Sequence, residues 1–221
     1  IRDPVATNEV NVGGTLNVLV AARDGGVRKV VYASSSSVYG DTPTLSKVEG
    51  MKPNPKSPYA VSKLAGEYYC RVFSEVYGIK TVALRYFNVF GPRQDPESQY
   101  AAVIPRFITR ILSGQPPIIY GDGTQTRDFT YVKDVVQANV KAMESNAEGV
   151  FNVAYNQRIS LLSLVDIIAG ETGVKVNPVF EPPRPGDIHD SQADISAAQK
   201  AFGYAPEYTV RPGLKETIAW Y

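Results

Sequence analysis

Apolar and polar residues alternate in two different rhythms along roughly the first ninety positions. Short runs rich in β-branched residues, "KVVYAS" and "KTVALRYF", are typical of buried parallel strands. Longer segments with apolar residues three or four positions apart predict helices over residues 7–24 and 59–77. Strands that alternate with helices in this way predict an α/β fold with a parallel sheet.

Helix 59–77 has a long apolar stripe, which predicts the side that faces the core. The stripe follows the i, i+3, i+4, i+7 rule and comprises Val61, Leu64, Ala65, Tyr68, Val72, Phe73 and Val76. Tyr59 and Lys63 fall nearly opposite it and neighbour each other on one face. From spacing alone, the simpler interpretation is a surface pair in which Lys63 bridges to Glu67.

The second half of the chain has a more mixed pattern, which predicts a smaller lobe. Helices are expected over residues 102–113 and 131–145, and Ser160 is expected to cap a further helix. The apolar side of helix 131–145 is predicted to comprise Val132, Val135, Val136, Val140 and Met143. "GVFNVA" is expected to form a strand that returns to the first half, whereas "GDGTQTRD" is expected to form a loop.

Composition and charge exclude several classes of function. The 221 residues are 43% hydrophobic and 20% charged, with a formal net charge of +1, which argues against nucleic acid or an anionic membrane as the main partner. No apolar run approaches the roughly 20 residues that span a bilayer. The single cysteine, Cys70, excludes an intrachain disulfide and fits a reducing cytoplasm. The single histidine, His189, disfavours a histidine-based metal site or a Ser-His-Asp triad, so no metal is expected.

A tyrosine and a lysine on one helical face can perform chemistry that neither performs alone. An unperturbed tyrosine has a pKa of about 10 and is a poor base at neutral pH. A nearby ammonium favours the phenolate, and a pyridinium ring would favour it further. Such a tyrosinate can remove a hydroxyl proton while a hydride leaves the same carbon. Tyr59 and Lys63 are therefore candidate catalytic residues.

The motif "YAVSK", residues 59–63, is accompanied by others in a fixed order. "ASSSSVYG" precedes it, and "LRYFNVFGPRQDP", "GDG…RDF" and "RPGD" follow. In this combination the chain resembles the extended short-chain dehydrogenase/reductases of the NAD-dependent epimerase/dehydratase family. Within them it is most similar to the UDP-N-acetylglucosamine and UDP-glucose 4-epimerases. The resemblance covers essentially the whole chain.

The fold that this resemblance implies is a Rossmann-type doubly wound parallel sheet with a smaller mixed α/β C-terminal lobe. Residues 1–88 would form the remaining part of the NAD-binding domain, to which residues 128–155 return. Residues 89–127 and 156–221 would form the nucleotide-sugar-binding lobe.

The resemblance also implies a mechanism. Tyr59 would take the proton from the 4-hydroxyl of a UDP-sugar while NAD+ accepts a hydride from carbon 4, and the 4-keto sugar would turn over before the hydride returns. Lys63 would bind the nicotinamide ribose and depress the pKa of Tyr59, and the Ser35 hydroxyl would bridge the sugar oxygen and Tyr59. The residues implied to contact the cofactor are Asn11, Ser34, Tyr59, Lys63 and Tyr86.

The residues implied to contact the substrate are Ser35, Ser36, Asn88, Arg127, Arg184, Asp187 and Ser191. Both arginines would clamp the diphosphate, whose geometry a guanidinium fork matches. Asn88 would also bond the diphosphate, and Asp187 would grip the nucleotide ribose. Ser191 falls where the epimerases place a gatekeeper, and its small volume favours UDP-GlcNAc and UDP-GalNAc, alongside UDP-Glc and UDP-Gal.

Ser36 and Ser37 bear on the alternatives. Dehydratase relatives have an Asp-Glu pair directly after the catalytic Ser/Thr, because eliminating water needs an acid and a base, and decarboxylase relatives usually keep the Glu. Hydroxyls cannot do that work near pH 7, so both reactions are disfavoured. A non-catalytic nucleotide-sugar-binding homologue is the third alternative, and an intact Ser35, Tyr59 and Lys63 argue against it.

One family feature is missing from the sequence. The family begins with a strand–Gly-x-x-Gly-x-x-Gly–helix unit that places the cofactor pyrophosphate on a helix N-terminus, and "NVGGTLN" has the wrong spacing for it. We therefore expect an incomplete sheet that lacks roughly 80–90 N-terminal residues, and little NAD binding or activity from this polypeptide alone. By analogy alone, we expect a homodimer joined through helices 7–24 and 59–77 as a four-helix bundle.

Overall fold

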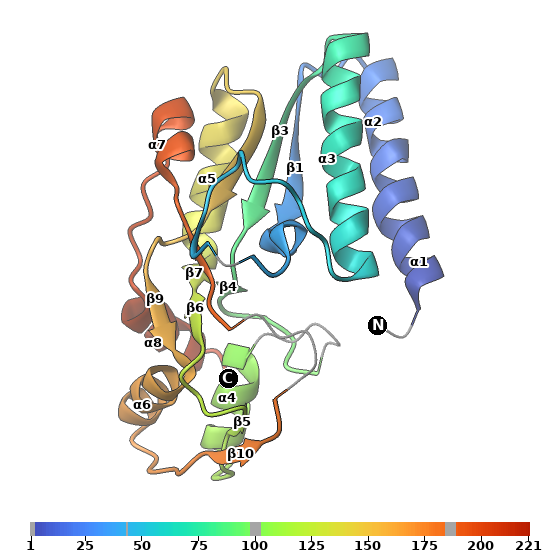
Figure 1. The fold of residues 1–221 in the computed structure, drawn as a ribbon. Helices are drawn as coiled ribbons and strands as arrows, with labels where there is room; N and C mark the ends of the chain where they lie inside the picture. Colours follow the sequence, from blue (N-terminus) through green and yellow to red (C-terminus); the bar gives the residue numbers. More distant parts are fainter. Residues whose placement is uncertain (1–2, 43, 98–102, 184–188) are drawn as a thin grey trace. The chain divides into compact units, whose positions relative to one another are not determined.

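The computed structural model of the chain describes residues 3–42, 44–97, 103–183 and 189–221. The chain divides into two compact units (Figure 1). The first comprises Ile1–Phe87, Val136–Val153 and Ala193–Ala205, and the second comprises Asn88–Val135, Ala154–Gln192 and Pro206–Tyr221. Residues 193–205, which the sequence placed in the lobe, thus pack within the first unit. No helix in the described ranges is both long enough and apolar enough to cross a membrane.

A three-stranded parallel sheet forms the centre of the first unit, as the strand pattern predicts. Its order is β1 (Lys29–Ser35), β3 (Lys80–Tyr86) and β8 (Gly149–Val153). Residues 81–85 of β3 are all buried, because this strand lies between the other two. Within the described part of the chain, β1 pairs with β3 alone.

Two long helical segments lie side by side next to this sheet (Figure 1). The predicted helix 7–24 is helical throughout but has three parts, α1 (Pro4–Asn8), a π-helical stretch (Glu9–Gly13) and α2 (Gly14–Asp24). The second segment is α3 (Pro58–Tyr77), and the Ser57 side chain caps it by accepting from the Ala60 N–H at 3.1 Å. Leu19 of α2 packs in one apolar cluster with Cys70 and Phe73 of α3.

The apolar stripe of α3 largely faces outward, which corrects the sequence prediction. Val61, Tyr68, Val72 and Val76 are exposed. The buried side instead comprises Ala60, Ser62, Gly66, Glu67, Cys70 and Phe73. Gly66 explains the difference, because a Cβ there would lie 2.2 Å from the hydroxyl oxygen of Tyr32 on β1. Close approach to the sheet, rather than bulk, thus selects the buried side.

Helix α5 (Val132–Glu144) departs from prediction in the same way. Val136, Val140 and Met143 of its predicted apolar side are exposed, whereas Ala138 and Ala142 are fully buried. Small residues again mark the close contact. The helix α7 (Ser196–Phe202) also packs in the first unit, where Phe202 meets Phe151 of β8 edge-on.

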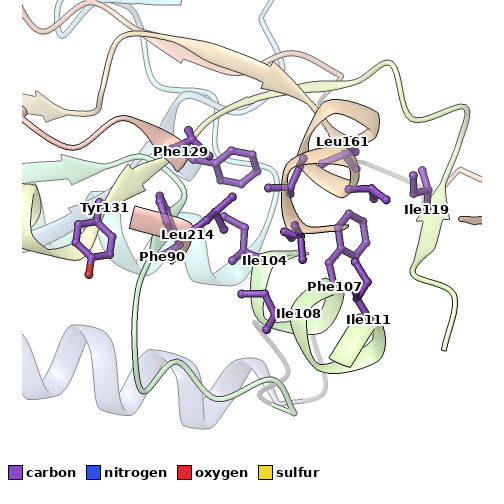
Figure 2. Close-up of a cluster of buried hydrophobic side chains, with 14 residues drawn as sticks. Phe90, Ile104, Phe107, Ile108, Ile111, Ile119, Phe129, Tyr131, Leu161 and Leu214 are labelled. Carbon is purple, nitrogen blue, oxygen red and sulfur yellow. The ribbon is translucent and has the colours of Figure 1, made fainter. Parts of the chain in front are cut away.

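A cluster of aromatic and branched side chains forms the core of the second unit. Figure 2 shows its members from several elements, among them Phe90, Ile104, Phe107, Ile108, Ile111, Ile119, Phe129, Tyr131, Leu161 and Leu214. The helices around it are α4 (Val103–Leu112), α6 (Leu161–Thr172) and α8 (Val210–Ile218). Ser160 caps α6 as predicted, since its Oγ accepts from the Ser163 N–H at 3.1 Å.

Short strands complete the second unit. They comprise β4 (Val89–Phe90) with β7 (Thr130–Tyr131), β5 (Ile118–Tyr120) with β10 (Val179–Glu181), and β6 (Thr126–Asp128) with β9 (Arg158–Ser160). The end of the predicted loop "GDGTQTRD" therefore forms a strand, β6, which pairs antiparallel with β9. A further pair is not confined to the second unit: β2 (Ser46–Lys47) belongs to the first unit and pairs with β11 (Gln192–Ala193).

Candidate active site

The four serines lie at the carboxyl end of β1. The strand ends at Ser35, and the chain turns at once into a 3-10 helix, Ser36–Tyr39. The Ser35 Oγ accepts from the Ser37 N–H at 3.2 Å, which caps this turn and leaves the serine's own proton available to donate. Gly40 ends the turn with φ 60°, where a Cβ would lie 1.9 Å from the Asn54 carbonyl oxygen. The serine run thus lies in a well-defined turn at the carboxyl end of a parallel strand, the position at which α/β folds bind ligands.

Lys63 ties the start of α3 to the end of β1. Its Nζ donates to the Ala33 carbonyl at 2.9 Å and lies 5.7 Å from the centroid of the Tyr59 ring. Burial lowers the pKa of Lys63. The surface-pair interpretation is wrong, because Lys63 bonds Ala33 while Glu67 is buried and pairs with Arg85.

The other side chains expected to contact a cofactor have partners within the first unit. The Asn11 Nδ2 donates to the Ser62 Oγ at 3.0 Å, which holds the N-terminal helix against α3 one turn from Tyr59. The Ser34 hydroxyl is buried and donates to Glu67 at 2.5 Å. The Tyr86 hydroxyl donates to Asn139 at 2.9 Å, and burial raises the pKa of Tyr86. Because the Ser34 hydroxyl is bonded to Glu67, the backbone of Ser34 is the part that can contact a cofactor.

The donors in this region fit one end of a dinucleotide. Lys63 donates one N–H to the Ala33 carbonyl, and its ammonium has further N–H donors for the hydroxyls of a ribose. The Ser35 O–H lies at the same end of β1, so the donor set suits a polyol beside a reacting hydroxyl. The sequence has no glycine-rich turn for a pyrophosphate. The residues present therefore fit the nicotinamide-ribose end of NAD.

In the second unit, Asn88 and Ser191 meet although the sequence separates them widely. The Asn88 Nδ2 donates to the Asp128 carbonyl at 2.9 Å and to the Ser191 Oγ at 3.4 Å. The backbone of Asn88 has φ 33°, a conformation that asparagine tolerates better than most residues. Two residues assigned separately to substrate binding thus lie together. Arg184 and Asp187, assigned to the same site, lie outside the described residues.

Arg127 and a neighbouring charged cluster are fixed by β6. The Arg127 Nη1 donates to the carbonyls of Thr126 and His189, both at 2.9 Å. Asp190 accepts from the Thr126 hydroxyl and from His189 Nδ1, and it pairs with Arg158 at 3.4 Å. The hydrogen bond from Thr126, followed by that from His189, lowers the pKa of Asp190. A β-bridge between Thr126 and Asp190 brings these residues together, and no sequence motif predicts the cluster.

A pocket of about 330 Å³ between α4 and β5 was also missed from sequence. Its lining residues are Val103, Arg106, Phe107, Thr109, Arg110, Ile118 and Tyr120. The Arg110 Nε donates to the Pro116 carbonyl at 2.7 Å, so this arginine holds the turn after α4. Aromatic and apolar walls beside Arg106 suit a flat polar ring. The one sequence feature that could have predicted this pocket is the spacing of Arg106 and Arg110, which lie one helical turn apart.

Comparisons with known proteins agree with this geometry. Residues 1–156 match the model of the NAD dependent epimerase/dehydratase family. The chain is 40% identical, over its full length and 72% of the relative, to a "Putative UDP-glucose 4-epimerase" of Methanocaldococcus jannaschii. A "UDP-N-acetyl-alpha-D-glucosaminuronate decarboxylase" of Bacillus cytotoxicus is 35% identical over 96% of the chain and 69% of its own length.

Solved structures are similar throughout the chain. A UDP-N-acetylglucosamine 4-epimerase from Methanobrevibacter ruminantium, in complex with UDP-N-acetylmuramic acid, has a TM-score of 0.96 and 42% identity over 99% of this chain and 70% of its own. A Thermus thermophilus UDP-glucose 4-epimerase in complex with NAD has a TM-score of 0.90 and 38% identity over the whole of this chain and 72% of its own. The expected Rossmann-type fold is confirmed.

Proposed function

The chain belongs to the NAD-dependent epimerase/dehydratase family, and we propose that it performs 4-epimerisation of UDP-GlcNAc and UDP-GalNAc, with UDP-Glc and UDP-Gal as further substrates. The observation that carries this proposal is the hydrogen bond from Lys63 to Ala33, which joins the Tyr-Lys helix to the serine strand. The residues proposed to react lie in the first unit, and those proposed to contact the nucleotide lie in the second.

Each reacting side chain has one task. NAD, when bound, supplies a carbon that accepts the hydride of carbon 4 and gives it back. Tyr59 as phenolate takes the proton of the 4-hydroxyl, so that the oxygen–hydrogen electron pair forms the carbonyl of a 4-keto sugar. The proton stays on the Tyr59 oxygen until it returns to O4 of the turned sugar. The Ser35 O–H donates to the sugar oxygen, and Lys63 provides the positive charge that favours the phenolate.

The residues that would hold the cofactor are Asn11, Ser34, Tyr59, Lys63 and Tyr86. Lys63 would donate to the ribose hydroxyls from the position that Ala33 fixes. Because the Asn11 Nδ2 is bonded to Ser62, its Oδ1 would be the atom that accepts from a cofactor hydroxyl. The contacts of Ser34 would come from its backbone.

The second unit provides the groups for a nucleotide diphosphate. Arg127, Arg184 and Asn88 would contact the phosphates, and Asp187 would contact the ribose. The pocket beside Arg106 and Tyr120 would take the uracil ring. The small side chain at Ser191 leaves room for an N-acetyl group. Ser36 would add a hydroxyl contact to the sugar.

The rival reactions within the family lack their acid–base pair here. Ser36 and Ser37 follow Ser35, and the Ser37 Oγ is buried without a hydrogen-bond partner in the described part of the chain. A hydroxyl in this place cannot act as the acid of an elimination near pH 7. The 35% identical decarboxylase keeps that reaction as the second candidate.

The exposed apolar stripe supports a homodimer. Val61, Tyr68, Val72 and Val76 lie on α3, and Val10 and Val18 lie on the neighbouring N-terminal helical segment. Exposed apolar side chains that gather on one helical face often mark association sites on proteins. Two such helix pairs would bury it as a four-helix bundle.

A product assay of the full-length protein with NAD bound, called the holoenzyme from here on, tests the reaction. UDP-GlcNAc and, in a separate reaction, a UDP-uronic acid are supplied, and the products are resolved by ion-exchange chromatography and NMR. We expect UDP-GalNAc to form, and Tyr59→Phe to be the inactive control. A 4-keto-6-deoxy sugar or loss of carbon dioxide from a uronic acid substrate would support a rival reaction, and no turnover of any UDP-sugar would support a non-catalytic binder.

A further inference from the structure

A buried ion pair joins α3, the helix that carries Tyr59 and Lys63, to β3. The Arg85 Nε donates to Glu67 Oε1 at 2.8 Å, and its Nη2 donates to Oε2 at 2.7 Å. Both side chains are only 4% exposed. Burying two charges is costly, and well-packed apolar residues of similar volume are often as stable or more stable. Stability alone therefore gives no reason for this pair.

Glu67 connects α3 to the residue next to Ser35. Its Oε1 also accepts from the Ser34 hydroxyl at 2.5 Å. One helical turn earlier, Lys63 donates to the Ala33 carbonyl. Two successive turns of α3 are thus attached to two successive residues of β1. A single attachment would let the helix roll or slide, whereas two attachments fix both its distance and its rotation.

Arg85 reaches the far end of the serine segment. Its guanidinium carbon lies 4.6 Å from the centroid of the Tyr39 ring, and Tyr39 ends the 3-10 turn that follows Ser35. The Tyr39 hydroxyl donates to Asn152 of β8 at 2.7 Å. The Arg85 Nη1 is buried and has no hydrogen-bond partner in the described residues. The pair therefore touches Ser34 at one end of the turn and Tyr39 at the other.

We propose that Glu67 and Arg85 are positioning residues, which hold the Ser35 hydroxyl in register with Tyr59 and Lys63. This inference rests on the proposed function. Neither residue touches the reacting atoms. Their task is to clamp both ends of the serine turn and to fix the catalytic helix against it.

Three variants of the holoenzyme test this role, and an exposed pair on the same helix provides the control. Glu67→Leu/Arg85→Met replaces the ion pair by apolar side chains of similar volume. Ser34→Ala keeps the ion pair and removes its link to β1. Glu67→Gln keeps the shape of the carboxylate and removes its charge. Glu75→Gln is the matched control, because Glu75 pairs with Arg71 two turns further along α3 in the solvent.

We expect a split between kcat and KM. The double variant should keep its unfolding midpoint and its KM for UDP-GlcNAc within about twofold, and its kcat should fall by about 10- to 100-fold, because a misplacement of about 1 Å can cost on the order of 100-fold. Ser34→Ala and Glu67→Gln should lower kcat in the same direction, and Glu75→Gln should leave it unchanged.

The outcomes separate the two proposals. A folded double variant with normal kcat would overturn the positioning role while wild-type turnover upholds the proposed function. Should the double variant not fold, normal kcat in Ser34→Ala and Glu67→Gln would overturn the role equally. A wild-type holoenzyme without epimerase activity would overturn the proposed function, and the positioning role with it.

Discussion

The phenolic oxygen of Tyr59 is the one atom that the proposed proton transfer cannot do without. Tyr59→Phe keeps the ring near Lys63 and removes only that oxygen. We expect kcat to fall by roughly a thousandfold, within the range that general acid–base catalysis contributes. Binding of UDP-GlcNAc, measured by calorimetry, should be largely unchanged because the assigned nucleotide contacts lie in the second unit. A near-normal rate would remove the base role from Tyr59.

Lys63 gives a prediction about pH. Lys63→Met removes the ammonium that favours the Tyr59 phenolate, so the phenol should need a higher pH to ionise. The rising limb of kcat against pH should therefore move to higher pH, and part of the lost rate should return as the pH is raised. An unshifted profile with a uniformly lower rate would indicate that Lys63 only holds structure through Ala33.

Ser191 gives a prediction about the sugar. Ser191→Tyr should raise KM and lower kcat for the acetylated sugars and leave UDP-Glc turnover nearly unchanged, because the added ring takes the volume of the N-acetyl group. Ser191→Ala is the control, since it removes only the hydroxyl that meets Asn88. Equal loss for both sugars in Ser191→Tyr would contradict the gatekeeper role.

The sequence placed single residues on their elements better than it identified their partners. The spacing of Tyr59 and Lys63 pointed to one face of one helix, which the structure has. The partner of Glu67 was misjudged, because Arg85 lies on a different element and burial cannot be read from helical spacing. The contact of Asn88 with Ser191 depends on strand pairing far along the chain and was out of reach for the same reason.

At the scale of elements, the periodicity of hydrophobic residues identified the long helices and the main strands. It gave the wrong buried side for two helices. In α3 and α5 several of the buried residues are small, among them Gly66, Ala138 and Ala142, and hydrophobic size is a poor guide where backbones approach closely. Gly66 is the clearest case, since the Tyr32 hydroxyl occupies the place of its missing side chain. The short strand β6 was missed because three residues carry too little period to be recognised.

Gly66 therefore gives a prediction about stability. Gly66→Ala should lower the free energy of unfolding by about 1–3 kcal/mol, the usual cost of overpacking, although alanine is the better helix former. Gly170→Ala in α6 is the matched control, because a Cβ there meets nothing within 4 Å and should stabilise by up to about 1 kcal/mol. Urea unfolding measures both. Equal gains in the two variants would show that Tyr32 moves aside at no cost.

At the scale of the whole molecule, the misjudged stripe becomes informative. A helix face built from Val61, Tyr68, Val72 and Val76 satisfies the period of a core-facing side, yet the chain's own core does not use it. The same pattern would also be found on a face that a second copy of the chain buries. The sequence pattern does not distinguish a covering surface of the same chain from one of another chain, because a core and an interface require the same periodicity of apolar residues.

The oligomeric state of the holoenzyme decides whether that covering surface is a second copy. We expect the wild type to be a dimer in light scattering, and Val61→Lys/Val72→Lys to be a monomer, because two lysines per chain would place four ammonium groups in an apolar bundle. Phe180→Lys is the control, since it removes an equally exposed apolar side chain from the second unit. The stripe variant should keep its secondary structure by circular dichroism, as its substituted side chains point away from the sheet. A wild type that stays monomeric at high concentration would contradict the bundle, and a stripe variant that stays dimeric would move the interface to another face.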